Sequence, residues 1–106
     1  MAQFDVHRNT GKHRDAIPFV VIVQSSVFSD YRRGVVVPLV RKSALGPINH
    51  VGLNPSFRIE EIDLVLHPLE IVSIPNEQLG EYILSLSSEG TRIITALAEL
   101  LSRAWK

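Results

Sequence analysis

The hydrophobic pattern predicts short strands over most of the chain and one helix at its end. Residues 3–7 alternate polar and apolar side chains, as a half-buried strand does. Residues 18–24 and 35–40 are nearly continuous apolar runs rich in β-branched residues, which is typical of strands covered on both faces. Because Pro38 has no N–H to donate, we expect the second of these strands to end, bulge or lie at a sheet edge there.

The middle of the chain predicts a hairpin followed by shorter elements. Residues 56–59 and 62–66 read as two strands joined by a tight turn at Glu60-Glu61, a pair that type I′ turns do not favour. We expect a short helix or turn and then a short strand between Pro68 and Pro75. Residues 80–86 are irregular or extended in this interpretation.

The last element is the clearest helix, running from about Ser88 to Arg103. Ser87 or Ser88 can cap its first turn by accepting a backbone hydrogen bond, and Glu89 suits the positive end of the helix dipole. Its apolar residues repeat at helical spacing and form one stripe that we expect to cover a sheet, namely Ile93, Leu97, Leu100, Leu101 and Ala104.

Length and composition place the chain among small proteins. It has 106 residues, which predicts a single domain over residues 1–106, and six prolines and six glycines keep its elements short. It has no cysteine, which excludes disulfides and thiolate metal sites. No apolar run reaches the ~18 residues of a membrane span, and the first residues lack the apolar stretch of a signal peptide. We therefore expect a soluble cytoplasmic protein with no membrane partner.

Charge is balanced overall but divided between the two halves. Residues 1–58 hold eight Lys and Arg against three Asp and Glu, a balance of +5, and residues 59–106 hold three against eight, a balance of −5. One interpretation is that these charges lie on ordinary solvated loops. The other is that a basic surface from the first half binds an acidic partner. The chain has no dense basic run, so sequence-specific nucleic-acid binding is not favoured.

No pattern of catalytic or metal-binding residues stands out. The four histidines show no metal-ligand spacing, and the chain has no nucleophile elbow and no phosphate-binding glycine loop. We therefore expect no metal, no cofactor and no enzymatic activity. The alternative is Arg32-Arg33 beside Ser29 and Asp30, because arginines next to hydroxyls can stabilise a phosphoryl transition state.

Several segments, taken in order, resemble the CcdB family of toxins over most of the chain. Arg33-Gly34-Val35-Val36-Val37-Pro38-Leu39 is similar to the family's Arg-x-Val-Val-x-Pro-Leu strand, and residues 19–25 resemble its Phe-Val-Val-Asp-Val-Gln-Ser segment, with Ile22 in place of the Asp. Four further segments follow the family's order and spacing, namely Gln3-Phe4-Asp5-Val6, Leu53-Asn54-Pro55-x-Phe57, Ile71-x-Ser73-Ile74-Pro75 and Leu79-Gly80-Glu81.

The resemblance implies an α+β fold of the CcdB/MazF-like, SH3-like barrel type. It comprises a five-stranded antiparallel sheet, a small three-stranded wing and a C-terminal helix, and it pairs as a homodimer. Toxins of this family bind the A subunit of DNA gyrase and trap its cleaved-DNA complex, and a CcdA-like antitoxin with a disordered tail removes them. The same fold also carries MazF-like endoribonucleases.

The resemblance also implies where partners bind. The known gyrase poison makes its contact through a terminal Trp-Gly-Ile, and those three places hold Ser102, Arg103 and Ala104 here. Trp105 lies three residues beyond the expected tryptophan, about one helical turn away. We therefore expect the target contact at Leu101, Ser102, Arg103, Ala104, Trp105 and Lys106. For the antitoxin contact we expect the basic residues Lys12, Arg14, Arg41 and Lys42.

Three functions thus stay open at this point. The first is a dimeric gyrase poison that acts by binding through Trp105 and its neighbours. The second is a MazF-like endoribonuclease that uses Arg32, Arg33 and a nearby hydroxyl. The third is an inactive homologue that binds only the antitoxin.

Overall fold

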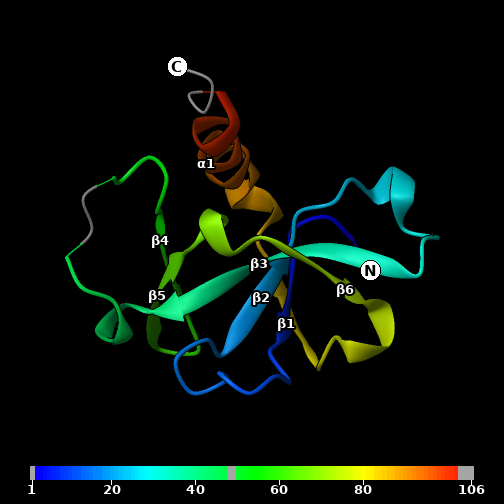
Figure 1. Cartoon of the computed structure of the whole chain (residues 1–106), viewed down its shortest axis with the longest axis horizontal. Coiled ribbons are helices and arrows are strands. Elements are labelled where there is room, and N and C mark those ends of the chain that lie inside the picture. Colours follow the sequence, from blue (N-terminus) through cyan, green and yellow to red (C-terminus); the bar gives the residue numbers. More distant parts are fainter. Residues whose placement is uncertain (1, 48–49, 103–106) are drawn as a thin grey trace.

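The computed structural model describes residues 2–47 and 50–102. Over these residues it contains seven strands, one α-helix and five short 3-10 helices (Figure 1). The strands are β1 (Asp5–Arg8), β2 (Phe19–Ile22), β3 (Arg33–Arg41), β4 (Ser56–Ile59), β5 (Ile62–Leu66), β6 (Val72–Pro75) and β7 (Tyr82–Ser85). The helices are η1 (Ser26–Phe28), η2 (Lys42–Ala44), η3 (Pro68–Glu70), η4 (Asn76–Gln78), η5 (Ser87–Glu89) and α1 (Gly90–Ser102).

The strands form one antiparallel sheet in the order β4-β5-β3-β2-β1-β7, with β6 also paired to β3. The long strand β3 belongs to two groups, because its first residues pair with β6 and its last residues with β5. One group is the five-stranded sheet β6-β3-β2-β1-β7, and the other is the three-stranded wing β3-β5-β4. The α+β architecture expected from the sequence is thus confirmed.

Strand β3 continues through Pro38 instead of ending there. Pro38 lies opposite Val20 of β2, and its carbonyl oxygen accepts a hydrogen bond from the His67 N–H at 3.1 Å. The nitrogen of Pro38 therefore faces the edge of β3 that pairs with β6 and β5. On that edge the pairing with β6 ends at Val36 and the pairing with β5 starts at Leu39, so Pro38 lies between the two. The proline costs no ladder bond at this gap, which is how a mid-strand proline is tolerated.

The predicted hairpin at residues 56–66 is confirmed, and its turn has an unusual backbone. Ile59 pairs with Ile62, so Glu60 and Glu61 form a two-residue loop. Their φ angles are 52° and 64°. Both residues thus adopt the left-handed conformation of a type I′ turn, which glycine and asparagine adopt more readily than glutamate. Neighbouring strands impose this turn on residues that do not favour it.

Helix α1 covers one face of the sheet. Ile93 and Ala96 are fully buried in the main core, which also contains buried side chains from the five strands β1 to β5. Arg92 fastens the helix to β4, since its guanidinium lies 4.5 Å from the Phe57 ring and donates to the Ser56 carbonyl at 2.7 Å. Leu101 is 70% exposed, so its place in the predicted apolar stripe is wrong. No helix in the described ranges has both the length and the apolar character needed to cross a membrane.

The start of α1 also differs from expectation. A 3-10 turn, η5, precedes the helix, and neither Ser87 nor Ser88 makes a side-chain cap there. Instead the Ser87 N–H donates to the hydroxyl of Ser85 at 3.1 Å. The first residue of the helix is Gly90, and the Phe4 ring packs so closely on it that a Cβ there would lie 2.6 Å from the ring. This tertiary contact thus requires a glycine at the helix start.

Candidate functional site

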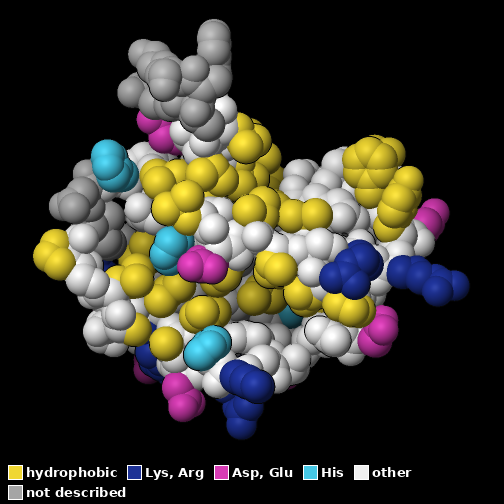
Figure 2. Space-filling model, in the orientation of Figure 1, with side chains coloured by type: hydrophobic (Ala, Val, Ile, Leu, Met, Phe, Trp, Pro, Cys, Tyr) yellow, Lys and Arg dark blue, Asp and Glu magenta, His cyan; other side chains and the backbone are white. Residues whose placement is uncertain are grey.

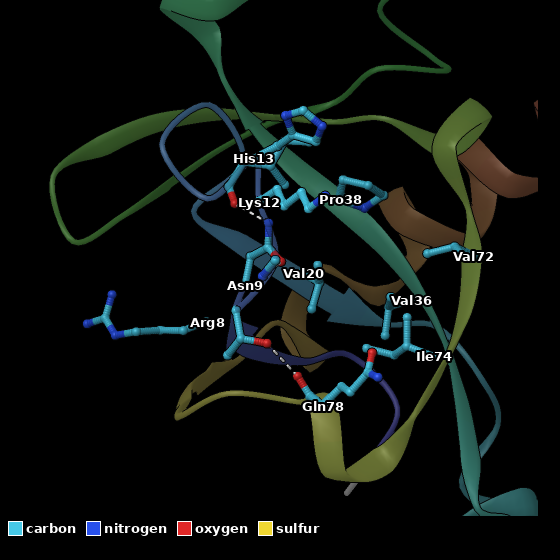
Figure 3. Close-up of a pocket in the computed structure, with 13 residues that line it drawn as sticks. Arg8, Asn9, Lys12, His13, Val20, Val36, Pro38, Val72, Ile74 and Gln78 are labelled. Carbon is cyan, nitrogen blue, oxygen red and sulfur yellow. Dashed lines mark hydrogen bonds between the residues drawn. The ribbon is translucent and has the colours of Figure 1, made fainter.

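An apolar groove lies on the face of the sheet opposite α1. Side chains of β2, β3 and β6 line it, and the loop of residues 9–13 and η4 form its polar side. Its volume is about 200 Å³. Figure 2 shows this hollow with hydrophobic side chains at its base, and Figure 3 shows how the lining residues lie. The apolar lining residues are Ile17, Val20, Val36, Pro38, Val72 and Ile74.

The loop between β1 and β2 is held in shape by Asn9. Its side-chain oxygen accepts from the Gly11 N–H at 2.9 Å, and its amide nitrogen donates to the Ile17 carbonyl at 2.8 Å. The Thr10 hydroxyl donates to the Gln78 carbonyl at 2.8 Å, which fixes the loop against η4. The loop thereby presents two of the predicted antitoxin-binding residues, Lys12 and Arg14, both exposed, with Lys12 beside the groove.

The other two predicted antitoxin-binding residues lie next to that loop. Arg41, at the end of β3, donates through its backbone N–H to the Ala16 carbonyl at 2.8 Å and through Nε to the Asp15 carbonyl at 2.7 Å. Lys42 follows in η2 and is exposed. Although 26 residues separate Arg41 from Asp15, the fold brings the two basic segments together on one side of the molecule.

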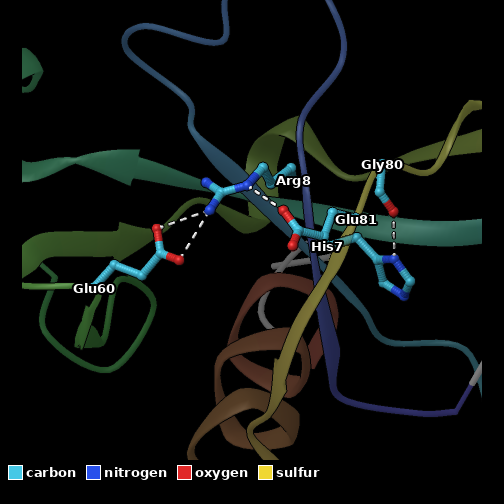
Figure 4. Close-up of polar contacts among 5 residues, drawn as sticks. All are labelled: His7, Arg8, Glu60, Gly80 and Glu81. Carbon is cyan, nitrogen blue, oxygen red and sulfur yellow. Dashed lines mark hydrogen bonds and ion pairs between the residues drawn. The ribbon is translucent and has the colours of Figure 1, made fainter.

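A charged cluster centres on Arg8, the last residue of β1 (Figure 4). Its Nε donates to Glu81 at 2.8 Å, and its Nη2 donates to both carboxylate oxygens of Glu60 at 2.9 and 3.2 Å. The hydrogen bond to Glu81 and, to a smaller extent, the one to Glu60 raise the pKa of Arg8 above its usual value. Nothing in the sequence pattern indicated this cluster, because the three residues come from three separate segments.

The loop between β2 and β3 carries an apolar surface that the sequence analysis missed. Val27 is 81% exposed, Tyr31 65% and Phe28 47%. The Phe28 and Tyr31 rings meet edge to face, with their centroids 5.8 Å apart. The sequence did contain a signal for this surface, namely apolar and aromatic residues in an otherwise polar turn. Such residues, when exposed on a loop, often mark an interaction site.

A second apolar surface involves α1 and the segment before β6, which contact each other. Leu69 of η3 is exposed, as are Ile71 and Val72 beside it. Ile94 and Leu101 are exposed on α1 itself. Figure 2 shows hydrophobic side chains gathered over this part of the molecule. We call the two apolar surfaces the β2–β3 loop surface and the α1–β6 surface.

The predicted target contact falls mostly outside the described residues. Leu101 and Ser102 are both exposed at the end of α1. The remaining four predicted residues, Arg103, Ala104, Trp105 and Lys106, lie outside the described residues. Their role therefore stays a prediction.

The arginines considered for catalysis separate into two environments. Arg33 donates from Nε to the Ser73 hydroxyl at 2.8 Å and from Nη2 to the Ser73 carbonyl at 2.7 Å. The hydroxyl beside the arginines thus comes from β6 and not from the neighbouring Ser29. Arg32 is exposed, and its carbonyl accepts from the Asn76 N–H at 2.8 Å. An exposed arginine–hydroxyl pair is the resulting chemical feature.

The histidines do not assemble into a metal site within the part of the chain that the structure describes. No three His, Asp or Glu side chains there are arranged to hold an ion. His7 contacts the Gly80 carbonyl through Nδ1 at 2.9 Å and packs edge to face on Tyr82. This is the environment of a strand-end histidine with a structural contact.

The fold is shared with solved structures at low sequence identity. An endoribonuclease from a Mycobacterial species, in complex with its cognate antitoxin, is 17% identical with a TM-score of 0.74, covering 100% of this chain and 99% of that chain. A second Mycobacterial endoribonuclease is 17% identical with a TM-score of 0.70, covering 100% and 95%. The Mycobacterium tuberculosis toxin MazF-mt6 is 16% identical with a TM-score of 0.72, covering 95% and 99%.

These structures correct the expectation that the chain is not an enzyme. Two of the proteins that share the fold are endoribonucleases, so the missing motifs do not support a non-enzymatic function for this fold. The physical reason is that residues far apart in the sequence, such as Arg33 and Ser73, can meet on neighbouring strands without leaving a local sequence motif. The absence of such motifs therefore excluded nothing.

Sequence comparison identifies the family. No curated protein sequence matches the chain significantly. The family model described as CcdB protein, however, matches residues 3–102, almost the whole length. This match agrees with the resemblance found in the sequence and with the antiparallel sheet and terminal helix of the structure. The chain belongs to the CcdB family.

Proposed function

We propose that this protein is the toxin of a type II toxin–antitoxin pair and that its target is the A subunit of DNA gyrase, whose cleaved-DNA complex it traps. The observation that carries the proposal is membership of the CcdB family over residues 3–102. Gyrase and its DNA are cytoplasmic, so the proposal also places the toxin in the cytoplasm.

The surfaces offered to such a target are apolar and exposed. Val27, Phe28 and Tyr31 form the β2–β3 loop surface, and each of these side chains is about half exposed or more. Large aromatic side chains of this kind are preferred anchors in protein interfaces. Together with the predicted contact at Leu101–Lys106, they are the residues we assign to the target.

The test is a gyrase cleavage assay on purified protein. Gyrase, ATP and supercoiled DNA are incubated with the toxin, and linear DNA released by detergent and protease is measured. We expect wild type to produce linear DNA, and Phe28→Ala and Trp105→Ala to lose most of it while keeping their thermal midpoints. No linear DNA with any amount of wild type would refute gyrase as the target.

We also propose that the antitoxin binds along the groove and the basic residues beside it. Lys12 and Arg14 on the loop, and Arg41 and Lys42 at the end of β3, suit the acidic tail that the family implies. The apolar base of the groove suits one large side chain of that tail. We call this combined area the antitoxin surface.

Charge reversal tests the antitoxin surface. Long-range attraction mainly raises the association rate and weakens with salt. We expect the double change Lys12→Glu and Arg14→Glu to slow association with the tail more than it speeds dissociation. The matched control reverses Arg58, which is paired with Asp63 at 2.9 Å on the outer strand β4. An association rate of wild type that does not vary with salt would contradict the proposal.

A homodimer is proposed through the α1–β6 surface. Five large apolar side chains are exposed there, and a symmetric dimer would bury the same patch on both copies. We expect light scattering to give twice the mass of one chain, and Leu69→Lys with Ile71→Lys, two exposed positions outside the groove, to give the mass of one. A monomeric wild type at micromolar concentration would contradict the dimer.

RNA cleavage is a second candidate, which the Arg33–Ser73 pair supports. Incubation of the protein with RNA alone separates the two candidates. Fragments that disappear with Arg33→Lys would favour the endoribonuclease. A wild-type protein that neither cleaves RNA nor produces linear DNA with gyrase, but still binds the antitoxin, would indicate the inactive homologue.

A further inference from the structure

Arg8 lies at the rim of the antitoxin surface, where its side chain points away from the groove and its guanidinium lies 5.7 Å from the Phe19 ring (Figure 3). It directly precedes the loop that carries Lys12 and Arg14. Glu81 holds its Nε and Glu60 holds its Nη2, as Figure 4 shows. The side chains of Arg8 and Glu60 are each 43% exposed, so a ligand can reach the pair.

The β4–β5 hairpin, which contains Glu60, carries further acidic residues in the same area. Glu61 and Asp63 border a recess with Arg41 and Lys42, on the other side of the turn. The acidic end of this hairpin thus lies between Arg8 and the two basic residues at the end of β3. Its turn is also strained, because Glu60 and Glu61 have φ angles of 52° and 64°.

We propose that the β4–β5 turn is an intramolecular competitor for the acidic antitoxin tail, with Glu60 occupying Arg8 until a carboxylate of the tail displaces it. This inference rests on the proposed function, since it assumes an acidic ligand at the antitoxin surface. Glu81 keeps the guanidinium oriented during the exchange, and displacement of Glu60 frees Nη2. Exposed ion pairs are weak, so the exchange is readily reversible.

Two charge-matched variants test the competitor. Glu60→Gln and Glu70→Gln change net charge equally, but only Glu60 bonds to Arg8, and Glu70 is exposed in η3 away from the antitoxin surface. The probe is a short fluorescent peptide in which glutamate alternates with leucine, and its binding is followed by anisotropy. We expect Glu60→Gln to bind about threefold to fivefold more tightly than Glu70→Gln, the effect of one exposed ion pair.

Substitution of Arg8 is the second test of the competitor. Arg8→Gln should weaken binding little in wild type, where Glu60 already occupies the arginine, and should remove the whole gain in the Glu60→Gln background. Equal affinities of the two glutamine variants would overturn the competitor while leaving the antitoxin surface intact. A peptide that binds none of the variants would overturn the antitoxin surface and the competitor together, whereas the gyrase assay would still report on the toxin.

Discussion

The two faces of the central strands β2 and β3 carry similar apolar residues, but one face is covered and the other is open. On the face under α1, Phe19, Val21 and Leu39 are fully buried in the main core. On the opposite face, Val20 and Val36 belong to a smaller cluster that borders the open groove. Neighbouring residues of β2 thus fill the closed core on one side and border an open groove on the other. A continuous apolar strand is therefore not evidence that both of its faces are closed.

The largest effect expected from this comparison is on the closed face. Phe19→Ala removes the largest fully buried side chain of the core, and loss of a buried aromatic ring costs about 3–5 kcal/mol. We expect the free energy of unfolding, measured in urea, to fall by that amount. A loss below about 1 kcal/mol would mean that the space under α1 collapses freely and that this face is not closely packed.

Neighbouring valines compare the two faces directly. Val21→Ala opens a cavity under α1 and should cost about 2 kcal/mol, whereas Val20→Ala enlarges a groove already open to water and should cost clearly less. The converse holds for the glutamate–leucine peptide, which should lose affinity only with Val20→Ala. Equal costs in urea together with equal peptide affinities would remove the distinction between the faces.

The sequence predicted the closed face better than the open one. Runs of β-branched residues located β2 and β3, and helical spacing located α1, because burial selects for those patterns. The groove depends on the position of the loop of residues 9–13 in the folded protein. The Arg8 cluster depends on three segments that meet only in the folded protein. Neither leaves a local pattern. Leu101 was placed in the apolar stripe by spacing alone, although the sheet ends before it.

A smaller effect tests how completely the closed face is filled. At Gly90 a Cβ would lie 2.6 Å from the Phe4 ring, so Gly90→Ala must displace that ring. Overpacking costs about 1–3 kcal/mol, and the better helix propensity of alanine recovers up to about 1 kcal/mol. We expect a net loss of about 1 kcal/mol in urea. Thr91→Ala, at the exposed neighbouring position, is the control and should be neutral or slightly stabilising.

The smallest effect should be a gain in stability, at the turn between β4 and β5. Glu61 has a φ angle of 64°, a conformation that costs a non-glycine residue about 1–2 kcal/mol. Glycine relieves this strain but loses more backbone entropy on folding, about 0.5–1 kcal/mol. We expect Glu61→Gly to stabilise the protein by less than about 1 kcal/mol in urea.

Glu60→Gly is the comparison for that gain. It relieves similar strain, at a φ angle of 52°, but it also removes the carboxylate that binds Arg8. We therefore expect it to stabilise less than Glu61→Gly, with a difference that shrinks as salt is added, because exposed ion pairs are screened. If the two glycine variants gain equally at low salt, the Arg8–Glu60 pair contributes nothing to stability, and the turn is held in its strained conformation by the strands alone.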